Sequence, residues 1–126
     1  MKYVESHYRT INDKNHRAIA GLSMGGFHSL YISANNPDLF GYVGLFSAAT
    51  SKQINNKNTS DVYENLDQKL ATQFSNPPHL YWIGIGKTDF LYKDNIDFRK
   101  QLDEKGYKYT YVETDGGHIW RNWRCL

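Results

Sequence analysis

One short glycine-rich segment constrains this chain more than any other part of its sequence. Residues 21–26 read Gly-Leu-Ser-Met-Gly-Gly and directly follow the apolar run Ala18-Ile19-Ala20. A serine in the pattern G-x-S-x-G between a strand and a helix is typical of a nucleophile elbow, a strained turn that exposes the serine oxygen above a sheet. We expect Gly21 and Gly25 to be required there, because a side chain at either position would collide with the neighbouring strand or helix.

The residues after this motif predict the helix that an elbow requires. Phe27, Leu30, Tyr31 and Ala34 are spaced at i, i+3, i+4 and i+7, so they share one apolar face of a helix of about three turns. Pro37 and the two asparagines before it end that helix. A glycine–serine turn without chemistry would explain neither the third glycine nor the immediate change from strand to helix, so the sequence favours the elbow.

The rest of the chain alternates between strand-like and helix-like segments, which is typical of an α/β fold. The third strand is apolar on both faces, as in a central parallel strand, whereas the fourth alternates and is expected nearer an edge. We therefore predict a mostly parallel sheet of about four strands flanked by helices. The expected strands are residues 18–20, 42–46, 80–85 and 107–112.

Two further helices and one loop are expected between these strands. Asp61 and Glu64 resemble a capping box at the start of the first helix. The second helix carries Leu91, Asn95, Phe98 and Leu102 along one side and ends at Gly106. The polar residues 50–60 are expected to form an exposed loop.

Length and charge exclude several classes of protein. A chain of 126 residues with 40% hydrophobic content is expected to form one domain, residues 1–126. Its net charge of +2 comes from 15 basic and 13 acidic residues spread along the chain, which gives no case for nucleic-acid binding. No stretch approaches the ~18 apolar residues of a membrane span, and the first residues lack the apolar core of a signal peptide. The single cysteine, Cys125, excludes an internal disulfide.

A serine needs two partners to act as a nucleophile at neutral pH. A histidine must accept the hydroxyl proton, and a carboxylate must hold the tautomer of that histidine and stabilise the imidazolium. In α/β enzymes with this elbow, the acid follows the serine in the chain and the histidine comes last. Asp89 fits the acid because it directly follows the strand 80–85, which puts it at the same carboxyl edge of the sheet as Ser23.

The competing carboxylates fit the acid position less well. Asp115 is close in sequence to the candidate histidine and stays the second choice. The others are expected on a helix surface or in a helix cap: Asp94, Asp97, Asp103, Glu104, Asp61 and Glu64.

Among the five histidines, only His118 follows the last strand and lies in a glycine-flexible loop, Asp115-Gly116-Gly117-His118. The glycines allow the ring to reach over the sheet edge, so His118 is the predicted base. The backbone N–H of Met24, the residue after the nucleophile, is expected to donate one hydrogen bond to the oxyanion. No metal and no cofactor is expected. The other histidines lie in expected helices or beside strands: His7, His16, His28 and His79.

Three segments together resemble a known family. They are residues 21–26, residues 86–92 with the sequence Gly-Lys-Thr-Asp-Phe-Leu-Tyr, and residues 116–124 with the sequence Gly-Gly-His-Ile-Trp-Arg-Asn-Trp-Arg. In order and spacing they resemble the esterase D-like esterases, and most of all the feruloyl and acetylxylan esterase modules of carbohydrate esterase family 1. The resemblance implies an α/β-hydrolase fold in which Ser23 is the nucleophile, His118 the base and Asp89 the orienting acid.

The same resemblance implies a partial domain. Family members carry a long N-terminal portion, with several strands and the loop that gives the second oxyanion N–H. In those proteins this portion precedes a helix, and residues 1–8 of this sequence are expected to start inside that helix. The sequence also stops at Leu126, about where the last helix of the family should be under way. We therefore expect residues 1–126 to form a single, truncated α/β-hydrolase domain whose uncovered strand edge and faces recruit a second copy, most simply as a two-fold dimer.

Two functional hypotheses follow. The first is a serine carboxylic-ester hydrolase that acts on feruloyl or acetyl esters of plant-cell-wall polysaccharide. The second is a self-associating fragment of such an esterase with weak or no turnover. The resemblance suggests a secreted or periplasmic bacterial enzyme, whereas the chain itself leaves the compartment open.

Overall fold

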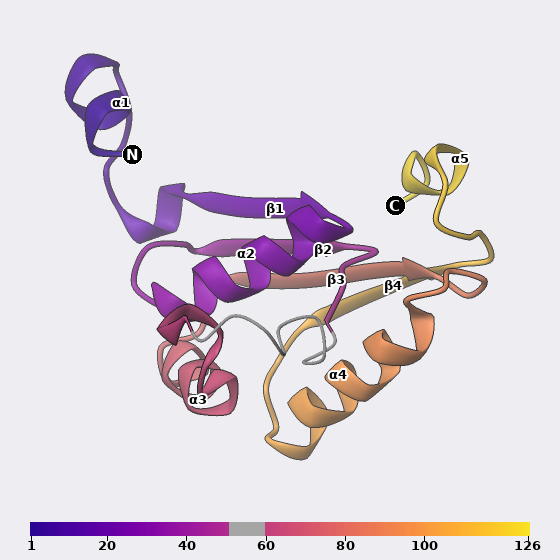
Figure 1. Ribbon diagram of the computed structural model, residues 1–126. Coiled ribbons are helices and arrows are strands. Elements are labelled where there is room, and N and C mark those ends of the chain that lie inside the picture. The colour runs from indigo at the N-terminus through magenta and orange to yellow at the C-terminus, as the bar shows by residue number, and fades with distance from the viewer. Residues whose placement is uncertain (51–59) are drawn as a thin grey trace.

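Four parallel strands form the centre of the molecule. The computed structural model describes residues 1–50 and 60–126. Within them a single sheet has the strand order β1-β2-β3-β4, so each strand pairs with the next one in the chain (Figure 1). The predicted α/β fold with about four parallel strands is confirmed. The strands are β1 (Ala18–Leu22), β2 (Tyr42–Phe46), β3 (Leu80–Gly86) and β4 (Thr110–Thr114).

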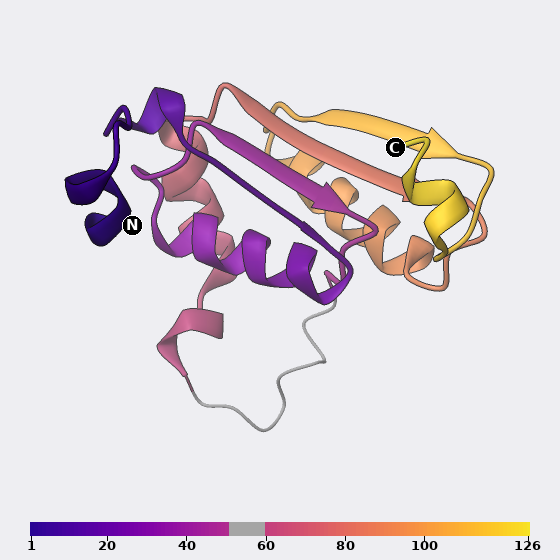
Figure 2. The ribbon, with the colours of Figure 1, turned by 90° about the horizontal axis from the view of Figure 1, so that it is seen from above.

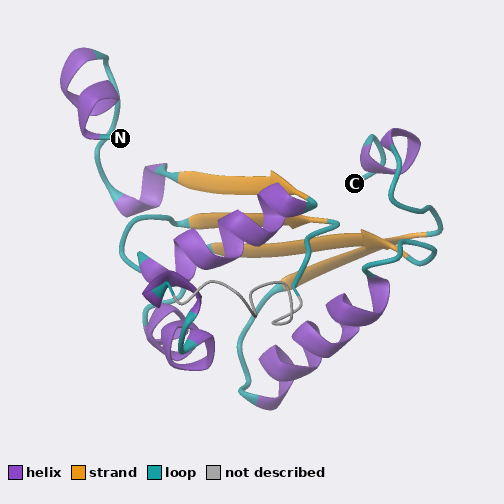
Figure 3. Ribbon diagram, viewed as in Figure 1, coloured by secondary structure: helices purple, strands orange, loops and turns teal. Residues whose placement is uncertain are grey.

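The three long helices connect successive strands and lie on the same side of the sheet (Figure 2). The short helices α1 and α5 lie away from them, near the two ends of the chain (Figure 3). The α-helices are α1 (Lys2–His7), α2 (Met24–Asn35), α3 (Leu66–Ser75), α4 (Tyr92–Glu104) and α5 (Trp120–Trp123), with 3-10 turns at Lys14–His16 and Asp61–Tyr63.

The core fills the space between the sheet and these helices. All four residues that predicted the apolar face of α2 are buried, as are Phe98 and Leu102 of α4. They pack against alternate residues of the two central strands, because successive side chains of a strand point to opposite faces. The buried hydrophobic residues of the sheet are Val43, Leu45, Tyr81, Ile83 and Ile85.

The other face of the sheet is only partly covered. We call its apolar residues the open face: Ala18, Ala20, Tyr42, Phe46, Leu80 and Trp82. Tyr42 is 39% exposed and Leu80 38% exposed. The Trp82 ring packs on Phe46 with centroids 4.5 Å apart, and it occupies the space above Gly84, where a Cβ would lie 2.0 Å from the indole. Leu126 also borders this face.

Three local expectations need correction. The first helix after the loop begins at Leu66, and Asn65 in the left-handed conformation precedes it, so Asp61 and Glu64 do not form its capping box. The last strand is Thr110–Thr114 rather than 107–112, because Tyr107 still belongs to the turn after α4 and stacks on Phe74. Of the expected exposed loop, Thr50 is buried and Ser60 exposed, while residues 51–59 lie outside the described residues.

The central strand gives a direct test of the core. Ile83 of β3 is fully buried, so Ile83→Ala should lower the free energy of unfolding by about 2–5 kcal/mol through lost burial and the cavity left behind. Ile96→Ala removes the same atoms from a side chain that is 40% exposed and should cost less than about 1 kcal/mol. Urea unfolding followed by circular dichroism measures both. Equal losses would contradict the assignment of β3 to the core.

Candidate active site

Ser23 lies in a strained turn between β1 and α2. Its backbone has φ 57° and ψ −113°, a conformation that costs a non-glycine residue free energy and persists only where the surroundings enforce it. Those surroundings are hydrogen bonds. The Ser23 N–H donates to the Phe46 carbonyl at 2.9 Å, and the Ser23 carbonyl accepts from the N–H groups of Phe27 and Ala49 at 3.1 and 3.2 Å. The predicted strand–turn–helix context is therefore present.

The glycines of the elbow are not equivalent. A Cβ on Gly21 would lie 2.0 Å from the Gly25 carbonyl oxygen, so the expected collision exists at Gly21. The same expectation is wrong for Gly25, because a Cβ there would meet nothing within 4 Å. Gly26 is the second constrained position, with a Cβ only 2.4 Å from that of Ala48. The reason is that Gly25 turns outward at the start of α2, whereas Gly21 and Gly26 face the strand–helix contact.

The structure brings the side chains of Ser23, His118 and Asp89 together, although they are up to 95 residues apart in the chain. The Ser23 Oγ lies 3.0 Å from His118 Nε2, and His118 Nδ1 lies 2.8 Å from Asp89 Oδ2. One neutral tautomer satisfies both bonds: Nδ1–H donates to the carboxylate, and Nε2 accepts from the hydroxyl. The Asp89 side chain is fully buried and that of His118 is 19% exposed.

Backbone contacts hold the two partner loops against each other. A Cβ on Gly86, at the end of β3, would lie 1.7 Å from the Gly116 carbonyl oxygen, so only glycine permits this approach. The Thr88 N–H donates to the same Gly116 carbonyl at 3.3 Å. The second oxygen of Asp89, Oδ1, accepts from the Leu91 N–H at 2.9 Å, which fixes the carboxylate plane.

The second-choice acid, Asp115, interacts elsewhere. Its carboxylate lies 3.1 Å from Lys87 Nζ and its side chain is 95% exposed. The hydrogen bond and charge of Asp115, together with the charge of Glu113, raise the pKa of Lys87. Two tyrosine hydroxyls, those of Tyr92 and Tyr111, donate to Glu113 at 2.7 Å and lower the pKa of its carboxyl.

The remaining histidines and the predicted oxyanion donor are also accounted for. His28 is exposed on α2, and the other three contact nearby polar groups: His7 bonds Ser6, His16 bonds Asp13 and His79 bonds Asn15. Met24 is the first residue of α2. The first N–H groups of a helix have no acceptor within it, so the Met24 N–H is free of intrahelical bonding beside Ser23.

Aromatic rings surround His118, and sequence reasoning did not assign them a place in the site. The Phe90 ring lies 4.8 Å from the imidazole between centroids, and the Trp123 ring 5.0 Å. Trp123 also donates a hydrogen bond from Nε1 to Ser47 Oγ at 3.1 Å. The sequence held two signals: Phe90 is next to Asp89 and Trp123 follows His118 by five positions, and both lie in segments that resemble the esterase family.

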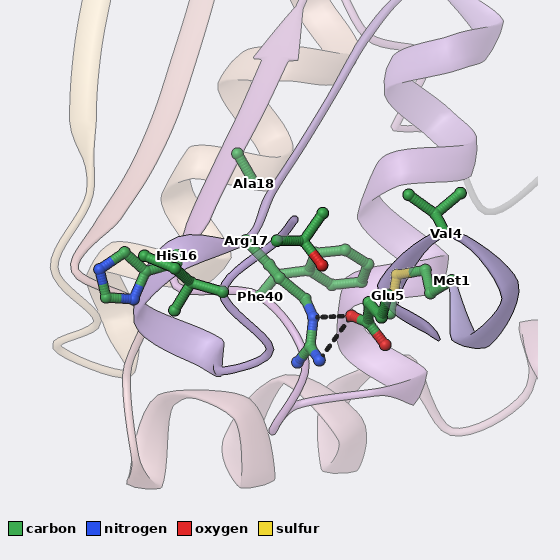
Figure 4. Close-up of a pocket in the computed structure, with 9 residues that line it drawn as sticks. Met1, Val4, Glu5, His16, Arg17, Ala18 and Phe40 are labelled. Atoms are coloured by element: carbon green, nitrogen blue, oxygen red, sulfur yellow. Dashed lines mark hydrogen bonds and ion pairs between the residues drawn. The ribbon is translucent and has the colours of Figure 1, made fainter. Parts of the chain in front are cut away.

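A pocket lies at the amino end of β1, where Arg17 forms a 2.7 Å ion pair with Glu5 (Figure 4). Because Ser23 follows the opposite end of that strand, this pocket is separate from the site.

Within residues 1–50 and 60–126, no group of three or more His, Cys, Asp or Glu side chains is arranged to hold a metal ion. None of the helices described has the length and hydropathy to span a membrane.

Known proteins are similar to this chain in sequence and in fold. A family model described as "Putative esterase" matches residues 1–126. The chain is a member of this esterase family. The likeness to esterases predicted from the three segments is thus confirmed, and with it the α/β-hydrolase fold class.

Individual known proteins are similar over nearly the whole chain. An endo-1,4-beta-xylanase/feruloyl esterase of Xylanibacter ruminicola is 45% identical over an alignment of 126 positions, which covers 98% of this chain and 15% of that protein. The serine hydrolase FphF of Staphylococcus aureus, described as fluorophosphonate-binding, has a TM-score of 0.80 and 26% identity over 97% of this chain and 55% of its own. A CE1 ferulic acid esterase of Anaeromyces mucronatus has a TM-score of 0.72 and 26% identity over 95% of this chain and 44% of its own. The chain therefore spans about half the length of these solved hydrolases.

The two elbow glycines make a matched pair of variants. Gly21→Ala should destabilise the fold by about 1–3 kcal/mol or more, since the added methyl group meets backbone atoms that cannot move independently. Gly25→Ala enters open space in a helix and should leave stability unchanged or raise it by up to about 1 kcal/mol. Thermal unfolding of both variants decides the matter. A Gly25→Ala variant as unstable as Gly21→Ala would contradict the packing described.

Proposed function

We propose that this chain carries the nucleophile, base and acid of a serine carboxylic-ester hydrolase. The observation that supports this most strongly is the continuous hydrogen-bonded series Asp89–His118–Ser23, with separations of 2.8 and 3.0 Å. These distances lie within the range needed for proton transfer. The strained backbone of Ser23 adds support, because such strain is concentrated at functional sites.

The chemistry follows from the roles of the three groups. His118 Nε2 takes the proton of Ser23 as Oγ attacks the ester carbonyl, and the Met24 N–H donates to the oxyanion that forms. The imidazolium then gives its proton to the departing alcohol, which leaves an acyl-serine. Water, deprotonated by His118, then attacks the acyl carbonyl, and the imidazolium returns this proton to Ser23 Oγ as the acyl–oxygen bond breaks and the acid leaves. Throughout, Asp89 stays ionised and stabilises the imidazolium.

We propose feruloyl or acetyl esters of plant-cell-wall polysaccharide as the substrate class. The support comes from relatives: the 45% identical protein is named a xylanase and feruloyl esterase, and another relative, 28% identical, is an acetyl esterase of Caldicellulosiruptor saccharolyticus. The chemistry of the three side chains fits either acyl group equally. No metal or cofactor has a part in these steps.

A second candidate is a weakly active or inactive form that self-associates. The mechanism proposed above has one oxyanion donor, the Met24 N–H. Loss of a single donor lowers the rate of such enzymes by about 10²–10³-fold. The residual activity would remain measurable, so the two candidates differ in rate rather than in the identity of the nucleophile.

Covalent labelling with a fluorophosphonate tests the nucleophile directly. The wild-type chain should be modified at Ser23, as located by peptide mass mapping, and Ser23→Ala should not be labelled at all. Asp89→Asn should slow labelling and aryl-ester hydrolysis by about 10⁴-fold, because the amide favours the wrong histidine tautomer. Loss of Ser23 together with His118 should cost no more than either alone, because they serve one proton transfer.

Asp115→Asn is the matched control, since it makes the same chemical change to an exposed carboxylate bonded to Lys87. Its labelling rate should equal that of the wild type. If Asp115→Asn were slow and Asp89→Asn normal, the acid would be reassigned. Labelling of Ser23→Ala would refute the proposed nucleophile.

We also propose that the chain associates with a second copy through the open face, most simply as a two-fold dimer. Exposed apolar sheet residues such as Tyr42 and Leu80 support this, because apolar patches of this kind commonly mark interfaces. β1 adds an edge strand at the end of the sheet, and uncovered strand edges also recruit chains.

Sedimentation at micromolar concentration should find a dimer that Tyr42→Glu converts to monomer, because the introduced charge would be buried in the interface. Tyr8→Glu, a similar change at a residue 66% exposed and outside the open face, should leave the dimer intact. A stable wild-type monomer would disprove self-association.

A further inference from the structure

The Trp123 side chain connects two parts of the site that the proposed mechanism treats separately. Its Nε1–H donates to Ser47 Oγ at 3.1 Å. The same indole meets the His118 ring edge to face, with centroids 5.0 Å apart and an interplanar angle of 88°. This T-shaped arrangement is one of the two that aromatic pairs prefer. Trp123 therefore contacts the base while being hydrogen-bonded to the end of β2.

Ser47 is a rigid acceptor. It is fully buried, and its φ of +42° puts it in the left-handed region that a non-glycine residue seldom adopts. Its own N–H donates to the Gly84 carbonyl of β3 at 2.7 Å. A strained residue held in this way persists only because its neighbours fix it.

The backbone around Ser47 is the same backbone that holds the nucleophile. Phe46, one residue earlier, accepts from the Ser23 N–H, and Ala49, two residues later, donates to the Ser23 carbonyl. Residues 46–49 are thus bonded to Ser23 on both sides and, through Ser47, to Trp123. A displacement of Trp123 would change the position of His118 relative to a nucleophile that stays in place.

The helix that carries Trp123 depends on such contacts for its own position. α5 has only four residues, too few for a helix to be stable by itself. Asn122, the residue before Trp123, is buried and accepts a hydrogen bond from Thr114 at the end of β4. Phe90, the other ring beside the imidazole, is 76% exposed and therefore less constrained. Of the two rings that pack on the imidazole, Trp123 is held by a hydrogen bond, whereas Phe90 is exposed.

We propose that Trp123 and Ser47 are positioning residues, whose hydrogen bond holds the imidazole of His118 at the distance and angle at which it accepts the Ser23 proton. The inference rests on the proposed ester-hydrolase function. Proton transfer needs the two heavy atoms within about 2.6–3.2 Å, and small misplacements of a reacting group are costly in rate. Neither residue accepts or donates a proton in the proposed steps, and both act through the position of the His118 ring.

Trp123→Phe and Ser47→Ala test this, since each removes one partner of the bond, and the first retains an aromatic ring beside His118. The probe is a small alkyl fluorophosphonate, and its maximal inactivation rate constant is measured separately from its binding constant. Each variant should lower the rate constant by about three- to tenfold, the usual worth of one hydrogen bond, with binding unchanged. The double variant should lose no more than either single variant, because the two changes break the same bond.

Trp120→Phe is the matched control. It removes an indole N–H from a neighbouring ring that is 73% exposed, and the rate constant should equal that of the wild type. A merely structural role of Trp123 would reduce the fraction of protein that labels without changing the rate constant of the folded fraction. Rates of Trp123→Phe and Ser47→Ala equal to that of Trp120→Phe, or losses that multiply in the double variant, would overturn the proposal.

A second measurement separates this inference from the function on which it rests. Failure of the wild type to label would refute the proposed function. The His118 Nδ1 proton, bonded to Asp89, can be followed by NMR without any turnover. Its exchange with water should be faster in Trp123→Phe and Ser47→Ala than in the wild type and Trp120→Phe. Unchanged exchange in the first two variants would overturn the positioning role by itself.

Discussion

Parallel pairing of consecutive strands is the constraint on which the rest of this structure depends. Because β1, β3 and β4 all run in one direction, their carboxyl ends meet at one edge of the sheet. Ser23, Asp89 and His118 each follow one of these ends. The crossover helices cover one face of the sheet and leave that edge free, so residues distant in the chain come within hydrogen-bonding distance. The chemistry of the site is therefore a consequence of the topology.

Close backbone contact then sets the geometry within this frame. The elbow depends on Gly21 lying against the Gly25 carbonyl, and the loops of Asp89 and His118 depend on Gly86 lying against the Gly116 carbonyl. In both places the missing side chain allows two backbone segments to approach directly. Ser23 and Ser47, whose strained backbones are held by hydrogen bonds, lie at the same edge of the sheet, next to these contacts.

The sequence was sufficient to predict the succession of strands and helices along the chain, the helix after Ser23 and the side chains that meet around Ser23. These predictions rest on periodicity and on short motifs, which are local properties. It was insufficient where a tertiary contact decides. Open space beside Gly25, the late start of the last strand after Tyr107 and the failure of Asp61 as a cap all depend on neighbours that are distant in the chain. The bond between Trp123 and Ser47 joins residues 76 positions apart, so no local pattern predicts it.

The packing of Trp82 over Gly84 has a consequence for the alignment of β3. This strand is apolar on both faces, so alternation of polar and apolar residues, which usually prevents a strand from slipping by one position, does little here. The size of the side chains, rather than their polarity, fixes the register of β3. A slip of one residue would turn the bulky indole toward the helices and would move Gly86 away from the Gly116 carbonyl, leaving a side chain where none fits. The alignment that brings Asp89 to the site is thus encoded by one large side chain and two absent ones.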